Sequence, residues 1–233
     1  MHIFYTPNIL QSAELPTEEV QHCVRVLRLK EGDEILLTNG TGLFFKAVLS
    51  LISQKHCKVE ILETVSQPLS WENQIHIAFA PAKNMDRNEF FAEKATEIGI
   101  NQISFLNCRY SERKEIKNER IEKILIAAMK QSQKATLPKL HEMIDFNKFI
   151  TQDFDGQKFI AHCHPEEKTH LAKAYKKGEN ALILIGPEGD FSEDEINLAV
   201  KNSFQPVSLG ESRLRTETAA LTACQTIHII NSI

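Results

Sequence analysis

One stretch decides how the second half of this chain folds: Ala181-Leu-Ile-Leu-Ile185, followed directly by Gly186-Pro-Glu-Gly-Asp-Phe-Ser192. The five apolar residues predict a strand buried on both faces, as in a parallel sheet. Ser192 with Glu195 three residues later is typical of a capping box, so we expect a helix to begin there. The turn then lies at the carboxyl end of a strand, where open α/β sheets bind ligands. As a bare pattern, a Gly-Pro turn before a helix is more often structural.

A second junction of the same kind follows. Residues 206–209 are predicted as a strand, Gly210 ends it, and a polar loop leads to a helix from Thr216 to about Ile230. Thr216 is the expected N-cap, and Glu217 suits the positive end of the helix dipole. Two such junctions can build one pocket between them. The nucleotide-binding patterns G-x-G-x-x-G and G-x-x-x-x-G-K-[ST] do not occur in the sequence.

The rest of the chain suggests two domains. Predicted strands at 75–80, 103–106, 158–161 and 181–185 alternate with helices at 86–98 and 118–133, which predicts a mostly parallel sheet with helices on its faces. Residues 1–70 differ, because a helix over 17–29 precedes strands at 34–38, 43–51 and 57–61. Residues 67–70 are predicted to form a linker, so we expect domains at 1–70 and 71–233.

Composition excludes several classes of protein. Apolar residues make up 42% and charged residues 25% of the 233, which excludes wholesale disorder and collagen-like repeats. The net charge of −4 excludes a globally basic nucleic-acid binder. Five scattered cysteines are typical of a reducing compartment. We find no apolar run of membrane-spanning length and no signal-peptide pattern, so we expect a cytoplasmic protein without a membrane partner.

Positive charge gathers in residues 71–140, which hold 12 basic and 9 acidic residues. Two interpretations stay open. Glu115, Glu119 and Glu122 are interleaved with the cations, as on a solvated helix face with ion pairs. The alternative is a surface that contacts phosphates.

His162-Cys163-His164 offers side chains that can bind a metal. A zinc site needs three or four ligands, and His170 is the only obvious neighbour in sequence. We therefore expect no metal site and interpret these histidines as a partly exposed strand end.

Several separated blocks resemble the ribosomal small subunit methyltransferase E family, whose members are RNA uridine-N3 methyltransferases of the SPOUT class. The C-terminal blocks are Ile185–Gly189 with Phe191-Ser192, and Leu209-Gly210 with Leu214–Ala219. The other blocks are His22–Arg28, Gly32-Asp33, Lys83, Arg87, Glu93–Ile100, Ser111–Arg113, Gln131-Ser132 and Pro138. The sequence departs from the family pattern at three places. Asp190 stands where glycine is usual, Lys134 stands where arginine is common, and Glu211-Ser212 precedes Arg213-Leu214 where a more compact apolar run is usual.

The resemblance implies a PUA-like β-barrel over residues 1–70 and a SPOUT domain over 71–233. The second is an α/β fold with a mostly parallel sheet and a C-terminal trefoil knot, whose knot loops would hold S-adenosylmethionine (AdoMet). It also implies a homodimer and, as RNA partner, 16S ribosomal RNA in the assembled small subunit. The expected reaction moves a methyl group to N3 of one uridine, which must be unpaired or flipped out of a duplex.

On this basis we predict three groups of site residues. Backbone groups of one set are expected to hold the cofactor: Leu184, Ile185, Gly186, Pro187, Glu188, Gly189, Leu209, Gly210, Leu214, Arg215, Thr216, Thr218 and Ala219. Arg215 is expected to orient the uracil or the cofactor carboxylate. Glu217 or Glu188 is the expected acceptor of the N3 proton, although for Glu217 a plain helix-terminus charge is the alternative. The predicted RNA contacts are His22, Arg25, Arg28, Lys83, Arg87, Lys94, Arg109 and Arg113.

Two other functions stay open at this point. One is a non-catalytic RNA-binding or ribosome-assembly module, against which the two intact glycine loops argue. The other is a SPOUT methyltransferase that acts on transfer RNA, against which the block before Gly32 argues. For His22, Arg25 and Arg28, ordinary solvent exposure is the alternative to RNA contact.

Overall fold

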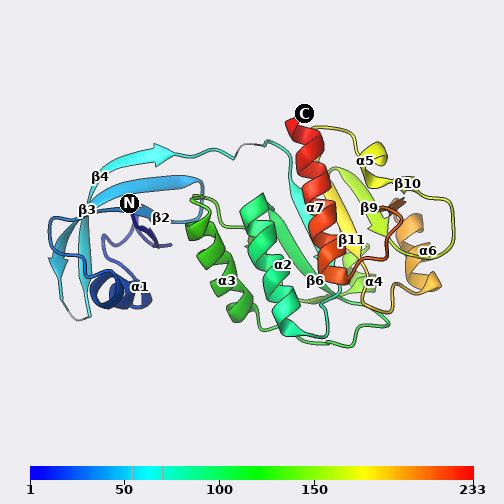
Figure 1. Cartoon of the computed structure of the whole chain (residues 1–233), viewed down its shortest axis with the longest axis horizontal. Helices are drawn as coiled ribbons and strands as arrows, with labels where there is room; N and C mark the ends of the chain where they lie inside the picture. Colours follow the sequence, from blue (N-terminus) through cyan, green and yellow to red (C-terminus); the bar gives the residue numbers. More distant parts are fainter. Residues whose placement is uncertain (54, 70) are drawn as a thin grey trace. The chain divides into compact units, whose positions relative to one another are not determined.

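The computed structural model describes residues 1–53, 55–69 and 71–233, and the chain forms two compact units (Figure 1). Unit 1 consists of Met1–Ser70 and Ile126–Leu137, and unit 2 consists of Trp71–Leu125 and Pro138–Ile233. The domains predicted from the sequence, 1–70 and 71–233, do not anticipate that residues 126–137 pack with unit 1. Ser70, the last residue of the predicted linker, lies outside the described residues. In the described part of the chain, no helix has both the length and the apolar character needed to cross a membrane.

Unit 1 is built on a sheet with the order β1-β2-β3-β4. Its strands are β1 (Ile3–Tyr5), β2 (Glu34–Thr38), β3 (Leu43–Ile52) and β4 (Cys57–Ser66); β1 and β2 pair in parallel, and the other neighbours are antiparallel. Apolar side chains from alternate strand positions fill its core, among them Phe4, Leu37 and Phe45. Residues 126–137 join this unit through polar contacts. Thr38 Oγ1 donates to the Ala135 carbonyl at 3.1 Å, and Lys130 Nζ lies 2.6 Å from Glu19 Oε1.

The predicted single helix over residues 17–29 is wrong. The structure has a short α-helix, α1 (Thr17–Gln21), that continues as a π-helix, η1 (His22–Val26). Arg28 then adopts a left-handed backbone with φ of 55°. Valine at positions 20, 24 and 26 lowers the propensity for a regular α-helix, and Val20 and Cys23 are buried in the core of unit 1. The expected face of His22, Arg25 and Arg28 is therefore not an α-helical face.

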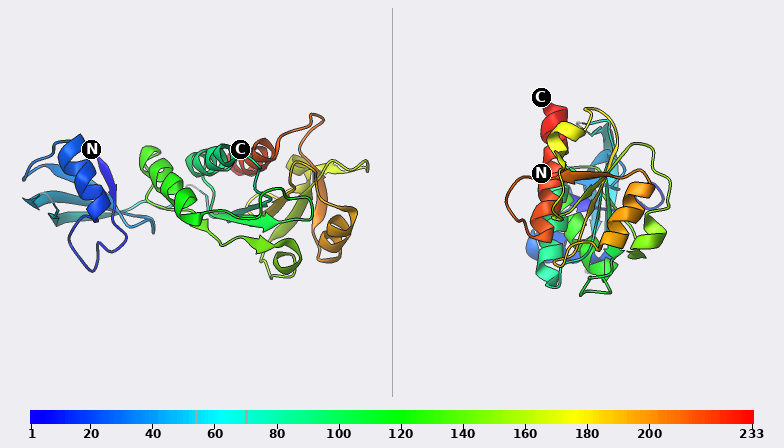
Figure 2. Two further views of the ribbon diagram at one scale, coloured as in Figure 1. Left: turned by 90° about the horizontal axis from the view of Figure 1, so that it is seen from below. Right: turned by 90° about the vertical axis from the view of Figure 1, so that its right-hand side faces the viewer.

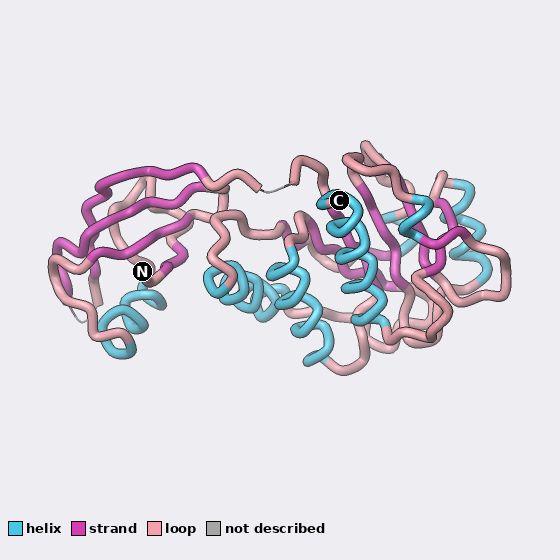
Figure 3. The backbone as a smooth tube through the Cα atoms, turned by 45° about the horizontal axis from the view of Figure 1, so that its top comes forward, coloured by secondary structure: helices cyan, strands magenta, loops and turns pink. Residues whose placement is uncertain are grey.

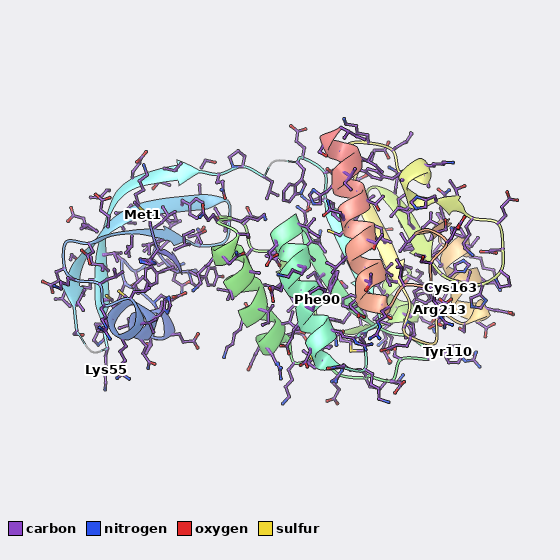
Figure 4. All side chains as sticks on the ribbon, viewed as in Figure 1. Met1, Lys55, Phe90, Tyr110, Cys163 and Arg213 are labelled. Carbon is purple, nitrogen blue, oxygen red and sulfur yellow. The ribbon has the colours of Figure 1, made fainter. Side chains whose placement is uncertain are left out.

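Unit 2 contains the predicted mostly parallel sheet, whose strands are drawn in magenta beside cyan helices in Figure 3. The sheet has the strand order β10-β12-β9-β11-β5-β6-β7, with β8 also paired to β6. Its strands are β5 (Ile75–Phe79), β6 (Gln102–Asn107), β7 (Lys139–Leu140), β8 (Ile144–Asp145), β9 (Gln157–Ala161), β10 (Thr169–His170), β11 (Ala181–Ile185) and β12 (Gln205–Ser208). All of these pairings are parallel. Every residue of β5 and β11 is buried, as expected for central strands with helices on both faces.

Helices cover both faces of this sheet (Figure 2). On one face, α2 (Met85–Ile98) packs against α7 (Thr216–Ser232), which also contacts β5, β11 and α5 (Leu171–Ala174). On the other face, α4 (Phe146–Phe149) packs against α6 (Glu193–Lys201). The capping box predicted at Ser192 is confirmed, since Ser192 Oγ accepts from the Glu195 amide and the Glu195 carboxylate accepts from the Ser192 amide. Helix α3 (Asn118–Gln131) begins in unit 2 and ends in unit 1.

Candidate functional site

A cavity of about 900 Å³ lies where three adjacent parallel strands end. The strand order β12-β9-β11 brings the carboxyl ends of these strands to one edge of the sheet. The loops that leave them, together with the start of α7, form the cavity wall. Pro187 and Leu214 line this same cavity, so the two glycine junctions of the sequence do meet in one pocket. Its volume is at the upper end of the roughly 300–1,000 Å³ typical of ligand pockets.

Most of the predicted cofactor-binding residues lie in this wall. They are Ile185, Gly186, Pro187, Glu188, Leu209, Gly210, Leu214, Arg215, Thr216 and Ala219. Three others lie outside it. Leu184 is buried within β11, Thr218 is an exposed residue of α7, and the Cβ position of Gly189 faces Tyr110 at 3.2 Å.

The loop between β12 and α7 offers its backbone to a ligand. Gly210 has φ of 123°, a conformation that favours glycine, and the space beside its Cα is open. Among the described groups, no hydrogen-bond partner is found for the amides of Gly210–Leu214. Arg215, not Thr216, is the N-cap of α7, and it supplies no side-chain acceptor to the first amides of the helix. These free polar backbone groups fit a small ligand with several hydrogen-bonding atoms, such as AdoMet.

Residues 161–168 form a part of the wall that our sequence interpretation missed as a ligand site. Ala161, His162, Cys163, His164, Pro165 and Lys168 contribute to it. This segment follows β9, and only the order of strands in the sheet reveals that it lies between the two glycine loops. Its sequence carries no glycine signal that would have marked it.

His162 is not the partly exposed histidine that we expected, because its side chain has no solvent exposure. Its Nε2 atom lies 2.9 Å from Glu166 Oε1, and neither ring nitrogen has a hydrogen bond of good geometry with the described groups. Burial, and then nearby Lys168, lowers the pKa of His162, against the opposing charge of Glu166. The described residues contain no group of three or more His, Cys, Asp or Glu side chains placed to hold a metal ion.

The two carboxylates considered as proton acceptors have different surroundings. Glu217 is 7% exposed, and its Oε1 atom lies 3.8 Å from Arg87 Nε of α2. Its Oε2 atom is buried and has no hydrogen-bond partner in the described part of the chain. Glu188 is exposed, and its Oε1 atom accepts the Lys83 amide at 2.9 Å. Glu188 therefore ties its loop to the segment after β5.

The predicted RNA-binding side chains of unit 2 already contact other groups of this unit. Lys83 pairs with Glu112 at 2.7 Å and Arg109 pairs with Asp194 at 3.0 Å. Lys94 contacts Glu93 and Glu97, which raise the pKa of its ammonium group. Arg113 donates to the carbonyls of Ala82 and Lys83. These cations are therefore already paired, although none of the ion pairs found among the described residues involves Glu115, Glu119 or Glu122.

The predicted RNA-binding residues of unit 1 are more open. His22, Arg25 and Arg28 are all exposed, and Val26 beside them is 66% exposed. No ion-pair partner of Arg25 or Arg28 is found among the described residues. A π-helical turn such as η1 occurs often at functional sites.

Comparison with known proteins identifies the relationship. A family model of an RNA methyltransferase domain matches residues 69–228, and one of an RNA methyltransferase PUA domain matches residues 15–62. The ribosomal RNA small subunit methyltransferase E of Rickettsia conorii is 30% identical over 94% of this chain and 90% of its own length. The chain belongs to the ribosomal RNA small subunit methyltransferase E family.

Solved structures of the family have the same fold. A structure described as a probable rRNA-methyltransferase from Porphyromonas gingivalis is 43% identical, covers 100% of this chain and 99% of its own, and superimposes with a TM-score of 0.95. The family member from Neisseria gonorrhoeae, bound to S-adenosyl methionine, is 27% identical and covers 98% of this chain and 97% of its own, with a TM-score of 0.87. The α/β fold with a mostly parallel sheet and the N-terminal PUA domain are therefore confirmed for this chain.

Proposed function

We propose that this protein transfers a methyl group from AdoMet to N3 of one uridine in 16S ribosomal RNA. The observation that carries the proposal is the cavity at the ends of β9, β11 and β12, into which both glycine junctions and the start of α7 converge. A related chain of the same fold is described with S-adenosyl methionine bound. The choice of uridine N3 as the methylated atom rests on the family resemblance.

The wall residues would hold the cofactor mainly through backbone atoms. Gly186 has little room beside it, since an added Cβ would lie 3.1 Å from Phe191, whereas Gly210 faces open space. Pro187 stiffens the first loop, and the amides of Gly210–Leu214, for which the described groups offer no partner, can donate to the ligand. Arg215 is exposed and lines the cavity at the start of α7, and it would orient the uracil or the cofactor carboxylate. AdoMet, when bound, supplies an electrophilic methyl group on a sulfonium.

The protein must also handle the N3 proton, because neutral uridine N3 is a poor nucleophile. Glu188 lines the cavity and Glu217 does not, but we favour Glu217 as the acceptor because of its surroundings. The Oε2 atom of Glu217 is buried and has no hydrogen-bond partner among the described groups, while Glu188 accepts a backbone amide. The Arg87 guanidinium lies 3.8 Å from the other carboxylate oxygen of Glu217.

We also propose a role for each domain, a knot in the second domain and an oligomeric state. We propose that residues 1–70 act as the PUA-like RNA-binding domain and residues 71–233 as the SPOUT catalytic domain, with the loops after β11 and β12 forming a trefoil knot. The protein would act as a homodimer on the small ribosomal subunit. RNA contacts would come first from His22, Arg25 and Arg28, which are exposed.

The experiment that tests this function has two steps. Calorimetry of the full chain with AdoMet should show one binding event; no binding heat would favour the non-catalytic RNA-binding module. Methylation of small ribosomal subunits, naked 16S RNA and transfer RNA, followed by mass spectrometry of the nucleosides, should then place the methyl group on one uridine of 16S RNA. Modification of transfer RNA instead would contradict the proposed substrate.

A further inference from the structure

Asp190 connects two walls of the cavity. Its Oδ2 atom accepts the Cys163 amide at 2.7 Å, and its Oδ1 atom accepts the Phe191 amide at 2.8 Å. Beside it, His164 Nε2 donates to the Phe191 carbonyl at 2.8 Å. The loop after β11 and the loop after β9 are therefore joined by side chains of both loops. Hydrogen bonds to a carboxylate are shorter and stronger than those between neutral groups.

The backbone at this position shows what the side chain is for. Asp190 has φ of 65°, and its own amide donates to the Pro187 carbonyl at 2.9 Å, which closes a turn. Glycine adopts this left-handed conformation at no steric cost, and aspartate is one of the few other residues that tolerate it. The turn itself thus has no need of a side chain. What aspartate adds is the pair of hydrogen bonds to Cys163 and Phe191.

The segment held in this way needs such support. Residues 162–168 connect the short strands β9 and β10 along the chain and contribute to the cavity wall. Cys163 and Pro165 in this segment are exposed. Lys168 Nζ donates to the His164 carbonyl at 2.5 Å, but this contact lies within the segment. A wall that is fixed before the ligand arrives loses less conformational entropy on binding, so the ligand binds more tightly.

We propose that Asp190 is a positioning residue that holds residues 162–164 against the pocket and so increases the affinity for AdoMet. The inference rests on the proposed function, because it concerns the same cavity. Asp190 itself lines the cavity, but each of its carboxylate oxygens accepts a backbone amide of the protein, so we assign its effect to the wall that it holds. Loss of Asp190 should therefore weaken AdoMet binding and leave the turnover rate at saturating AdoMet nearly intact.

The test compares D190G and D190N with D194N as the matched control. D190G keeps the turn and removes both hydrogen bonds, so we expect the Kd for AdoMet by calorimetry to rise about tenfold. D190N retains one acceptor oxygen and tolerance of the left-handed backbone, and its Kd should lie between those of D190G and the unchanged protein. Asp194 is an exposed carboxylate that pairs with Arg109 at 3.0 Å, outside the cavity wall, and D194N should bind AdoMet normally. The KM for AdoMet should rise with Kd, while kcat changes less than about twofold.

A second measurement, on the protein without ligand, keeps this inference separate from the proposed function. Amide hydrogen exchange of the peptide that contains Cys163 should be faster in D190G than in the unchanged protein or D194N, because the Cys163 amide loses its acceptor. Unchanged exchange in D190G, or an unchanged Kd for AdoMet, would overturn the inference. If the unchanged protein bound no AdoMet, the proposed function would fail, and the exchange result would still decide whether Asp190 fixes this wall.

Discussion

Glu217 carries a buried carboxylate oxygen with no partner in the described part of the chain, and such an oxygen is costly to leave unsatisfied. A ligand or a proton at this atom would supply the missing partner. The other oxygen of this carboxylate lies 3.8 Å from Arg87 Nε. The sequence pointed to Glu217 only through the family resemblance, since a glutamate in the first turn of a helix is equally expected from the helix dipole.

Replacing Glu217 by Gln should separate these two roles. Glutamine keeps the size of the side chain and removes its basicity, so E217Q should lower the rate of methyl transfer at saturating AdoMet by about 10²–10⁴-fold. AdoMet affinity, measured by calorimetry, should stay within about twofold of the unchanged value. E193Q is the matched control, because Glu193 is an exposed acidic residue in the first turn of α6. A full methylation rate in E217Q would show that Glu217 is only a helix-terminus charge.

At the scale of elements, the end of α2 is fixed by glycine. Gly99 caps the helix with φ of 124°, and a Cβ there would lie 2.2 Å from the ring of Trp71. Trp71 in turn packs edge-on against His228 of α7, with ring centroids 4.6 Å apart, and its Nε1 donates to Asn101 Oδ1 at 3.1 Å. The close approach of this ring joins α2 to α7, which packs on β5 and β11 and begins at the cavity.

The G99A variant should destabilise the protein by about 2–4 kcal/mol, since it adds a steric clash to an unfavourable backbone conformation. G178A is the matched control: Gly178 also has positive φ, 84°, but a Cβ there meets nothing within 4 Å. G178A should lower the free energy of unfolding by only about 1–2 kcal/mol. Urea unfolding, followed by the fluorescence of Trp71, the only tryptophan of the sequence, measures the stability of both variants. Equal midpoints for the two variants would contradict the packing argument.

Elements with strong apolar patterns were predictable, and short ones were not. The range of β11 was predicted without error and that of α2 to within one residue at its start, because their patterns are unbroken. The two-residue strands β7, β8 and β10 have no period to detect. The same limit applies to the site. Pro187 and Leu214 follow glycine-ended strands, whereas His162–Lys168 joined the cavity through the order of strands, which is a tertiary property.

For the molecule as a whole, the question is how a chain with a net charge of −4 binds RNA. Most cations of the basic middle block named above are already paired with carboxylates or carbonyls. Arg25 and Arg28 of unit 1 are exposed and have no ion pair among the described groups. Binding should therefore depend on a few unpaired cations and not on net charge.

Affinity for small-subunit RNA should fall steeply with salt, and removing a phosphate contact should flatten that dependence. R25A and R28A should each weaken binding and reduce the slope of log K against log salt by about 1. K94A, whose ammonium group is held by two glutamates, should leave the slope unchanged. Filter binding over a salt series measures all three. If K94A reduced the salt dependence of binding and R25A did not, Lys94 and not Arg25 would be the phosphate contact.

The segment Ile126–Leu137 has a consequence for any attempt to cut the protein in two. Because this segment belongs to unit 1 while the residues on either side of it belong to unit 2, the polypeptide passes between the units three times. A protease that nicks the chain near residue 70 would separate residues 1–70 covalently from the rest, but residues 126–137 would stay on the larger fragment and hold the two fragments together through contacts such as Lys130 with Glu19. A shortened gene that starts at residue 71 would encode Lys130 and Ala135 without Glu19 and Thr38, the groups that they contact. Clean dissection requires an engineered bypass that replaces residues 126–137.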